Sequence, residues 1–367
     1  MSEFEIYPNN DILILNKLNI YKFILPLNVH LIELYCDHNQ LIELPELPKT
    51  LKILDCSYNQ IITLPKLIHT HLNTLYCNYN NLKSLPVLPK TLIELDCSNN
   101  KLKKLPKLNY LQYLSCRSNT ISYIYVLPNS LLGLDCSFNK IKKIKYLPKH
   151  LRCFNCSHNF LKSLPLQPHS LVHLKCIDNQ IQSFPYLSNN LELLNCSYNH
   201  IQKLPELPSF LFILFCNHNK LSSLPTLPHH LEELDCCSNH ITKIPILPYT
   251  ISLLLIKDNP IIQYPIIHNS HMMISFNLNM YDELKQQNIR IGNTFIEHEK
   301  YNQYIKYYNV KTLYLIYKYG HKLFYKILEK RMNRFKQELL YQYSILLYNP
   351  TRIERMLNEG IDIFYDD

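Results

Sequence analysis

A pattern of about 20 residues repeats along most of the chain and restricts the possible folds more than any other feature. One unit runs from Leu51 to Leu67, with Leu54, Cys56 and Asn59 at its fourth, sixth and ninth positions. A sequence with this period predicts an array of stacked units that bury a continuous core together and nothing alone. The units begin at Leu31, Leu51, Leu72, Leu92, Leu111, Leu131, Leu151, Leu171, Leu191, Leu211, Leu231 and Ile251, and a weaker one continues through Ile274, Phe276 and Asn279.

Each unit follows the consensus L-x-x-L-x-C-x-x-N-x-[LI]-x-x-[LI]-P-x-L-P-x-x. The alternation around positions 3 to 6 has the period of a β-strand. The asparagine at position 9 recurs in every unit, and its amide is predicted to bond backbone groups of neighbouring turns. The L-P-x-L-P return is too short and too rich in proline for a helix, so it is predicted to be extended or polyproline-like.

This pattern resembles the leucine-rich repeat family over about residues 31–281. The resemblance implies an α/β repeat: a solenoid with a parallel concave sheet, an extended or polyproline-like convex side, and a small helical C-terminal segment. The short L-P-x-L-P unit resembles the subclass found in bacterial type III effectors. The Cys-Ser-x-Asn form, in a chain biased toward Leu, Ile, Asn, Lys and Tyr, looks more like the repeat proteins of giant amoebal DNA viruses.

We divide the chain into three parts: an N-terminal cap at 1–30, a solenoid of about 12 full repeats and a degenerate one at 31–284, and a helical segment at 285–367. The repeat rhythm stops near Tyr281, and no proline occurs between Met280 and Asn349. In the last part, basic residues four apart oppose an apolar face, which is the pattern of an amphipathic helix. This segment could cap the last repeat, dock a partner, or contact a membrane or nucleic acid.

Eleven of the 13 cysteines occupy position 6, and we expect them to be small buried hydrophobic residues without disulfide bonds. Cys153 and Cys156 form a C-x-x-C pair, but positions 3 and 6 point to opposite sides of a strand, so no zinc site is predicted. Cys237 is predicted to face outward as an accessible thiol. No cofactor and no metal are predicted.

The resemblance implies that unit positions 2, 3, 5, 7 and 8 face a ligand on the concave side. Acidic residues outnumber basic ones at these positions, which disfavours a phosphate backbone and makes nucleic acid an improbable partner for this face. Outward aromatic residues among the acids are candidate anchors for a protein. The predicted protein-binding residues are Asp55, Tyr58, Tyr79, Asp96, Asp135, Phe138, Tyr198, Phe212, Phe215 and Asp235.

Lysines gather instead on the turn and return positions of the fourth and sixth units. No aromatic stacking platform repeats beside them in register, so we interpret these lysines as an ordinary solvent-exposed surface. The alternative is that they bind nucleic acid or an anionic membrane. The lysines concerned are Lys101, Lys103, Lys104, Lys107, Lys140, Lys142, Lys143, Lys145 and Lys149.

The sequence contains no H-E-x-x-H, G-x-S-x-G or phosphate-cradling glycine motif. Effectors with similar repeats often carry a ubiquitin ligase with a catalytic cysteine, but no cysteine follows Cys237. We therefore expect a non-enzymatic module that binds a protein or peptide on its concave face. The alternatives are a structural or assembly spacer, and a binder of nucleic acid or anionic membrane through its basic edge. Neither a signal peptide nor a membrane span is expected, which favours the cytoplasm, or the host cytoplasm for a viral protein. The partner's identity and the oligomeric state remain open.

Overall fold

A computed structural model describes residues 4–5, 11–26, 29–263, 265 and 273–275. Within these ranges every regular element is a short strand and none is a helix. The predicted helical segment at 285–367 lies outside the described residues. The strands are β1 (Phe4–Glu5), β2 (Ile12–Ile14), β3 (Phe23–Ile24), β4 (Glu33–Tyr35), β5 (Ile53–Asp55), β6 (Thr74–Tyr76), β7 (Glu94–Asp96), β8 (Tyr113–Ser115), β9 (Gly133–Asp135), β10 (Cys153–Asn155), β11 (His173–Lys175), β12 (Leu193–Asn195), β13 (Ile213–Phe215), β14 (Glu233–Asp235), β15 (Leu253–Leu255) and β16 (Met273–Ser275).

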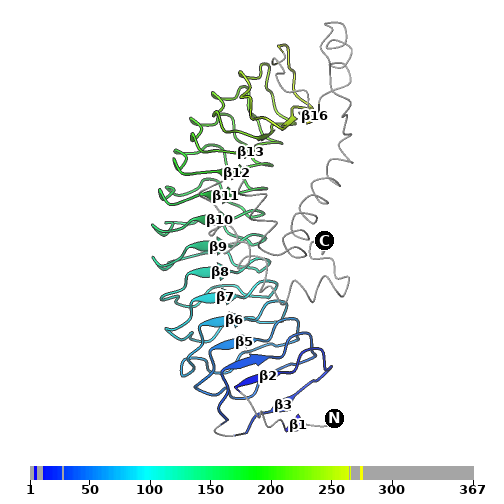
Figure 1. The fold of residues 1–367 in the computed structure, drawn as a ribbon, viewed down its shortest axis with the longest axis vertical. Coiled ribbons are helices and arrows are strands. Elements are labelled where there is room, and N and C mark those ends of the chain that lie inside the picture. Colours follow the sequence, from blue (N-terminus) through cyan, green and yellow to red (C-terminus); the bar gives the residue numbers. More distant parts are fainter. Residues whose placement is uncertain (1–3, 6–10, 27–28, 264, 266–272, 276–367) are drawn as a thin grey trace. The chain divides into compact units, whose positions relative to one another are not determined.

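The repeats form a parallel solenoid with one strand per unit (Figure 1). Each strand from β4 to β14 pairs in parallel with the next, and the register joins equivalent unit positions, as with Leu34 opposite Leu54. Each strand covers positions 3 to 5 of its unit, and the following residues return through turns and extended backbone. The predicted parallel sheet is therefore confirmed.

The core is built from the repeated leucines and the cysteine column. Leu34, Leu54 and Cys56 have no exposed surface, and neither does any other cysteine at position 6. All 13 cysteines are buried, and the eleven at position 6 form the buried column that the sequence predicted. Removing a thiol from water disfavours its charged form, so burial raises the pKa of Cys116, Cys136 and Cys156 well above the ordinary value. Cys237 is 4% exposed, so the prediction of an accessible thiol there is wrong.

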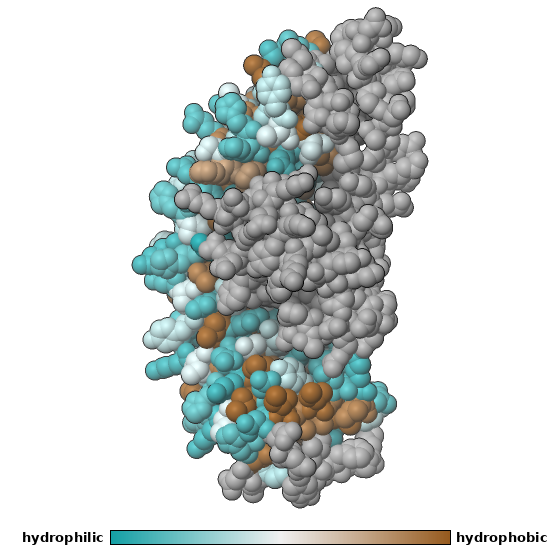
Figure 2. Space-filling model, in the orientation of Figure 1, coloured by the Kyte–Doolittle hydropathy of each residue, from teal (hydrophilic) through white to brown (hydrophobic). Residues whose placement is uncertain are grey.

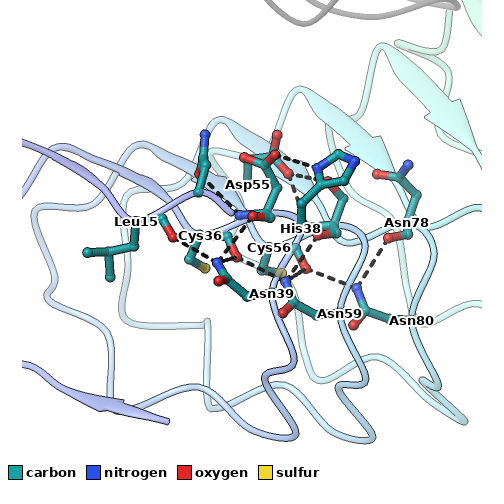
Figure 3. Close-up of polar contacts among 12 residues, drawn as sticks. Leu15, Cys36, His38, Asn39, Asp55, Cys56, Asn59, Asn78 and Asn80 are labelled. Carbon is teal, nitrogen blue, oxygen red and sulfur yellow. Dashed lines mark hydrogen bonds and ion pairs between the residues drawn. The ribbon is translucent and has the colours of Figure 1, made fainter. Parts of the chain in front are cut away.

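Position 9 supplies a ladder of asparagine amides next to this core. The Asn59 Nδ2 group donates to the carbonyl oxygens of Cys36, Cys56 and Ser57 at 3.0–3.1 Å, while its Oδ1 accepts from the Leu41 N–H at 3.0 Å. Figure 3 shows Asn39, Asn59 and Asn80 in a row, each bonded in the same way. Each amide thus joins two successive turns, as predicted, and satisfies carbonyls that the bend turns away from the sheet.

The turn after each strand has an unusual backbone. Position 8 has a positive φ, between 50° and 57°, in all twelve units, although none of these residues is glycine. Bulky residues rarely adopt this conformation. Here it is held by the next turn: the N–H groups of Tyr58 and Tyr79 donate to the carbonyls of Asn78 and Ser98, both at 3.0 Å.

The described part of the predicted N-terminal cap adds one more rung to the sheet. β2 pairs in parallel with β4, and Leu13, Leu15 and Phe23 are buried like core residues of the repeats. β1 and β3 form a separate two-stranded pair. The outward side chains Ile12 and Ile14 of β2 are exposed, and Figure 2 shows hydrophobic residues gathered in the lower part of the view, where the N-terminal rungs lie.

Candidate protein-binding face

The outward side chains of the strands and of the turns that follow form a continuous surface, which we call the strand face. It consists of unit positions 3, 5 and 8, with position 2 at its margin. Position 7, which the resemblance also placed on this side, is buried in eight of the twelve units, as at Ser57 and Cys237. The ten predicted binding residues all lie on it or at that margin, but they fall into three groups with different surroundings. The sheet places them one rung apart, about 4.8 Å for each successive unit.

The aspartates at position 5 hold the turn that follows them. The Asp55 Oδ1 atom accepts from the N–H of Ser57 at 3.1 Å and from its hydroxyl at 2.5 Å. The pairs Asp96–Ser98 and Asp135–Ser137 repeat this arrangement, and Asp235 accepts from the Cys237 N–H at 3.1 Å. Asp55 and Asp235 are moreover buried, at 5% and 6% exposure. The sequence prediction did not include this structural role, although the recurring Asp-x-Ser spacing was its signal.

The rings at position 8 stack on one another from turn to turn. His38, Tyr58 and Tyr79 form a three-ring stack with centroids 4.3 and 4.2 Å apart and planes within 11° of parallel. Because position 8 has the same backbone in each unit, equivalent side chains leave the turn in the same direction. This ring stack contains two predicted anchors and a histidine that the prediction left out.

Two shorter stacks continue the column further along the solenoid. Phe138 lies 3.9 Å from His158, and the Arg117 guanidinium sits 4.7 Å above the Phe138 ring. Tyr198 lies 4.2 Å from His218. Phe138 and Tyr198 are 43% and 52% exposed, so each presents part of its ring to solvent. These are the most accessible of the predicted aromatic anchors.

Phe212 and Phe215 lie in the tenth unit, at positions 2 and 5, and both are half-buried. Phe212 meets His230 edge-on with ring centroids 6.3 Å apart. Phe215 is flanked in the sheet register by Asn195 and Asp235. The two phenylalanines thus have different neighbours.

Position 3 contains partly buried titratable groups that the prediction missed. The Tyr76 hydroxyl donates to Glu94 Oε1 at 2.9 Å, and burial raises the Glu94 pKa. The sheet register brings His173 beside Cys153, with 3.5 Å between Nδ1 and Sγ. Burial lowers the His173 pKa from 6.5 to about 4, and Lys175 adds to the shift. From the sequence, these pairs could have been found only by aligning adjacent units in their 20-residue register and comparing the residues at neighbouring positions.

The described ranges contain neither a metal-binding cluster nor a membrane-spanning helix. No cluster of three or more His, Cys, Asp or Glu side chains is arranged there to hold a metal ion. Those ranges also contain no helix long and apolar enough to cross a bilayer.

Comparison with known proteins identifies the fold family. No protein-family model matches the chain, and no curated protein sequence matches it. Among solved structures, YopM from Yersinia enterocolitica WA-314 is 32% identical, with a TM-score of 0.69, over 73% of this chain and 64% of that one. YopM from Yersinia pestis, described as a leucine-rich effector protein, is 29% identical with a TM-score of 0.64, over 73% of this chain and 88% of that one.

The functional domain of InlJ from Listeria monocytogenes, described as including a cysteine ladder, is 28% identical with a TM-score of 0.56, over 63% of this chain and 58% of that one. The chain therefore spans less than two thirds of the first YopM structure and of the InlJ domain. The 20-residue parallel turns, the buried cysteine column and these similarities agree with one another. The chain has the leucine-rich repeat fold.

Proposed function

We propose that this protein is a non-enzymatic interaction module that binds a protein or peptide on the concave side of its solenoid, which the strand face forms. The observation that carries this proposal is the column of stacked rings at position 8. The rings are fixed in place by the backbone, yet Phe138 and Tyr198 stay about half exposed. Rigid aromatic groups lose little conformational entropy on binding, which is why they are frequent anchors of protein interfaces.

The acidic residues have a smaller role in this proposal than in the sequence prediction. Asp55, Asp96, Asp135 and Asp235 each accept hydrogen bonds from the turn behind them. They still make the face negative, and a negative face steers basic partners toward it. We therefore assign affinity to the rings and to Phe212 and Phe215, and assign steering to the aspartates.

The test compares full-length wild-type chain with two variants in quantitative capture from cell extract. One variant combines Phe138→Ala with Tyr198→Ala, and the other combines Phe212→Ala with Phe215→Ala. Loss of an interface anchor typically weakens binding by about 2 kcal/mol or more, about 30-fold. The control is Ile246→Ala, at a return position that is 89% exposed.

We expect a specific protein to be retained by wild type and by the control and lost from at least the ring variant. Equal retention by all chains, with circular dichroism showing that all are folded, would refute the assignment of the strand face. A chain that retains no protein but is abundant in an assembled particle would favour the alternative of a structural spacer.

The free thiols are relevant to the cellular compartment in which the protein acts. Eleven reduced cysteines in register suit a reducing compartment, where disulfides rarely persist. We therefore propose that the protein acts in the cytoplasm, of a host cell if it is delivered there. The resemblance to proteins of amoebal viruses remains a prediction, as do the division at residues 30 and 284 and the role of 285–367.

A further inference from the structure

Two adjacent units, the fifth and the sixth, lack the proline that the other units have at position 15, and the solenoid fold does not require this change. Position 15 is Tyr125 in the fifth unit and Lys145 in the sixth. In the other units it is proline: Pro45, Pro65, Pro86, Pro106, Pro165, Pro185, Pro205, Pro225, Pro245 and Pro265. Proline has no N–H to donate, whereas Tyr125 and Lys145 restore that group. At this place the return backbones form an isolated parallel bridge between Ile124 and Ile144.

The bridge fixes which side chains are neighbours. Ile124 and Ile144 point inward, at 5% and 4% exposure. In extended backbone, the residues on either side of them point outward, so Tyr123 and Tyr125 lie beside Lys143 and Lys145. All four side chains are exposed. Together with Tyr146 they form what we call the tyrosine–lysine patch.

The tyrosine rings in the patch are arranged face to face. Tyr123 and Tyr125 stack with centroids 5.4 Å apart and planes 24° from parallel, and they are 49% and 75% exposed. The Lys145 ammonium lies 5.1 Å from the centre of the Tyr146 ring, which is 69% exposed. Along the described solenoid no platform repeats in register beside the lysines, but this single tyrosine pair was not identified from the sequence.

Positive charge surrounds the patch. Lys103 and Lys104 occupy positions 12 and 13 of the preceding unit, so the tyrosine pair has lysines in the turns on both sides. Asp135 is the only acidic residue in the sequence between Asp96 and Asp178, and its carboxylate holds the turn at Ser137 on the strand face. The return side of the fourth to sixth units is thus strongly basic.

From this geometry we infer that the tyrosine–lysine patch binds single-stranded nucleic acid, with a base stacked on the exposed tyrosine pair and phosphates contacted by the flanking lysines. Stacking platforms within basic surfaces are the general means of binding single strands without reading their sequence. Tyrosines and lysines alternate in the patch. Elements that lie on membranes instead separate an apolar face from a basic one. The patch is separate from the strand face, so this inference does not depend on the proposed protein binding.

The experiment measures the fluorescence anisotropy of a labelled 15-nucleotide oligo(dT) or oligo(U) with the full chain at several salt concentrations. One variant combines Tyr123→Ala with Tyr125→Ala, and a second combines Lys143→Gln with Lys145→Gln. Phe210→Ala, 52% exposed, and Lys220→Gln with Lys243→Gln, at exposed return positions of other units, are the matched controls. Vesicles of phosphatidylserine and phosphatidylcholine are tested in parallel.

We expect the tyrosine variant to bind about 5- to 150-fold more weakly with an unchanged salt slope, as the loss of one stacked base predicts. The lysine variant should lower the slope of log affinity against log salt by about 0.7 for each lost contact. The controls should bind like wild type. The inference is overturned by absence of oligonucleotide binding, by binding that the tyrosine variant leaves unchanged, or by association with vesicles alone.

Discussion

Replacing one rung of the asparagine ladder gives a sharp test of how the turns are held together. The Asn139 Nδ2 group donates to the carbonyls of Cys116, Cys136 and Ser137 at 2.9, 3.2 and 3.0 Å. Its Oδ1 accepts from the Ile121 N–H at 3.0 Å. The residue is 7% exposed, so water does not readily replace these bonds. We expect Asn139→Ala to destabilise the solenoid strongly.

The size of this destabilisation depends on which hydrogen bonds the partners of Asn139 keep in the variant. The Cys116 carbonyl still accepts from Asn119 at 3.1 Å, and the Cys136 carbonyl still accepts from Asn159 at 3.0 Å. The Ile121 N–H loses its amide acceptor, and leaving a buried donor unpaired costs about 1–3 kcal/mol. The lost donor bonds add about 1 kcal/mol each. The expected loss is therefore about 4–6 kcal/mol in the free energy of unfolding.

Urea denaturation followed by circular dichroism measures this loss, with Asn129→Ala as the control. Asn129 is exposed in a return turn, so its replacement should change the free energy of unfolding by less than about 0.5 kcal/mol. Asn139→Asp separates the two functions of the amide, because it keeps an acceptor for Ile121 but places a carboxylate among carbonyls. We expect it to destabilise at neutral pH and less so in acid. If Asn139→Ala matched the control, the ladder would not be a determinant of stability.

Two further predictions concern the thiols and the buried histidine. The folded chain should react with a thiol reagent only as fast as it unfolds, because all 13 cysteines are buried as thiols. The variant Cys237→Ser should react at the same slow rate. A single rapidly reacting thiol that this variant removes would contradict the burial of Cys237. The His173 pKa is lowered from 6.5 to about 4, so neutral His173 supports the fold above pH 6.5, and up to about 3 kcal/mol of stability should be lost as the pH falls from 6.5 to 4. His173→Gln should flatten the unfolding free energy over this pH range, and an unchanged pH dependence would show that His173 is not the group responsible.

The repeat by itself determined the architecture of this protein. Cys at position 6 and Asn at position 9 were predicted to be buried and to bond neighbouring turns, and both are, because an array gives each residue the same surroundings as its counterpart 20 residues away. A pattern that recurs in twelve units also fixes the register of the sheet. The predicted residues of the binding face could be placed on it for the same reason.

Only the tertiary structure decided what those residues do with their side chains. The carboxylates of Asp55 and Asp235 accept hydrogen bonds from the turns that directly follow them. The rings of Tyr58 and Tyr79 stack because position 8 has a positive φ. The tyrosine–lysine patch arises where two units that lack proline at position 15 bring Tyr125 and Lys145 side by side on the return path. A linear pattern assigns a residue to a face, whereas hydrogen bonding and ring contact depend on distances between turns that only the folded chain sets.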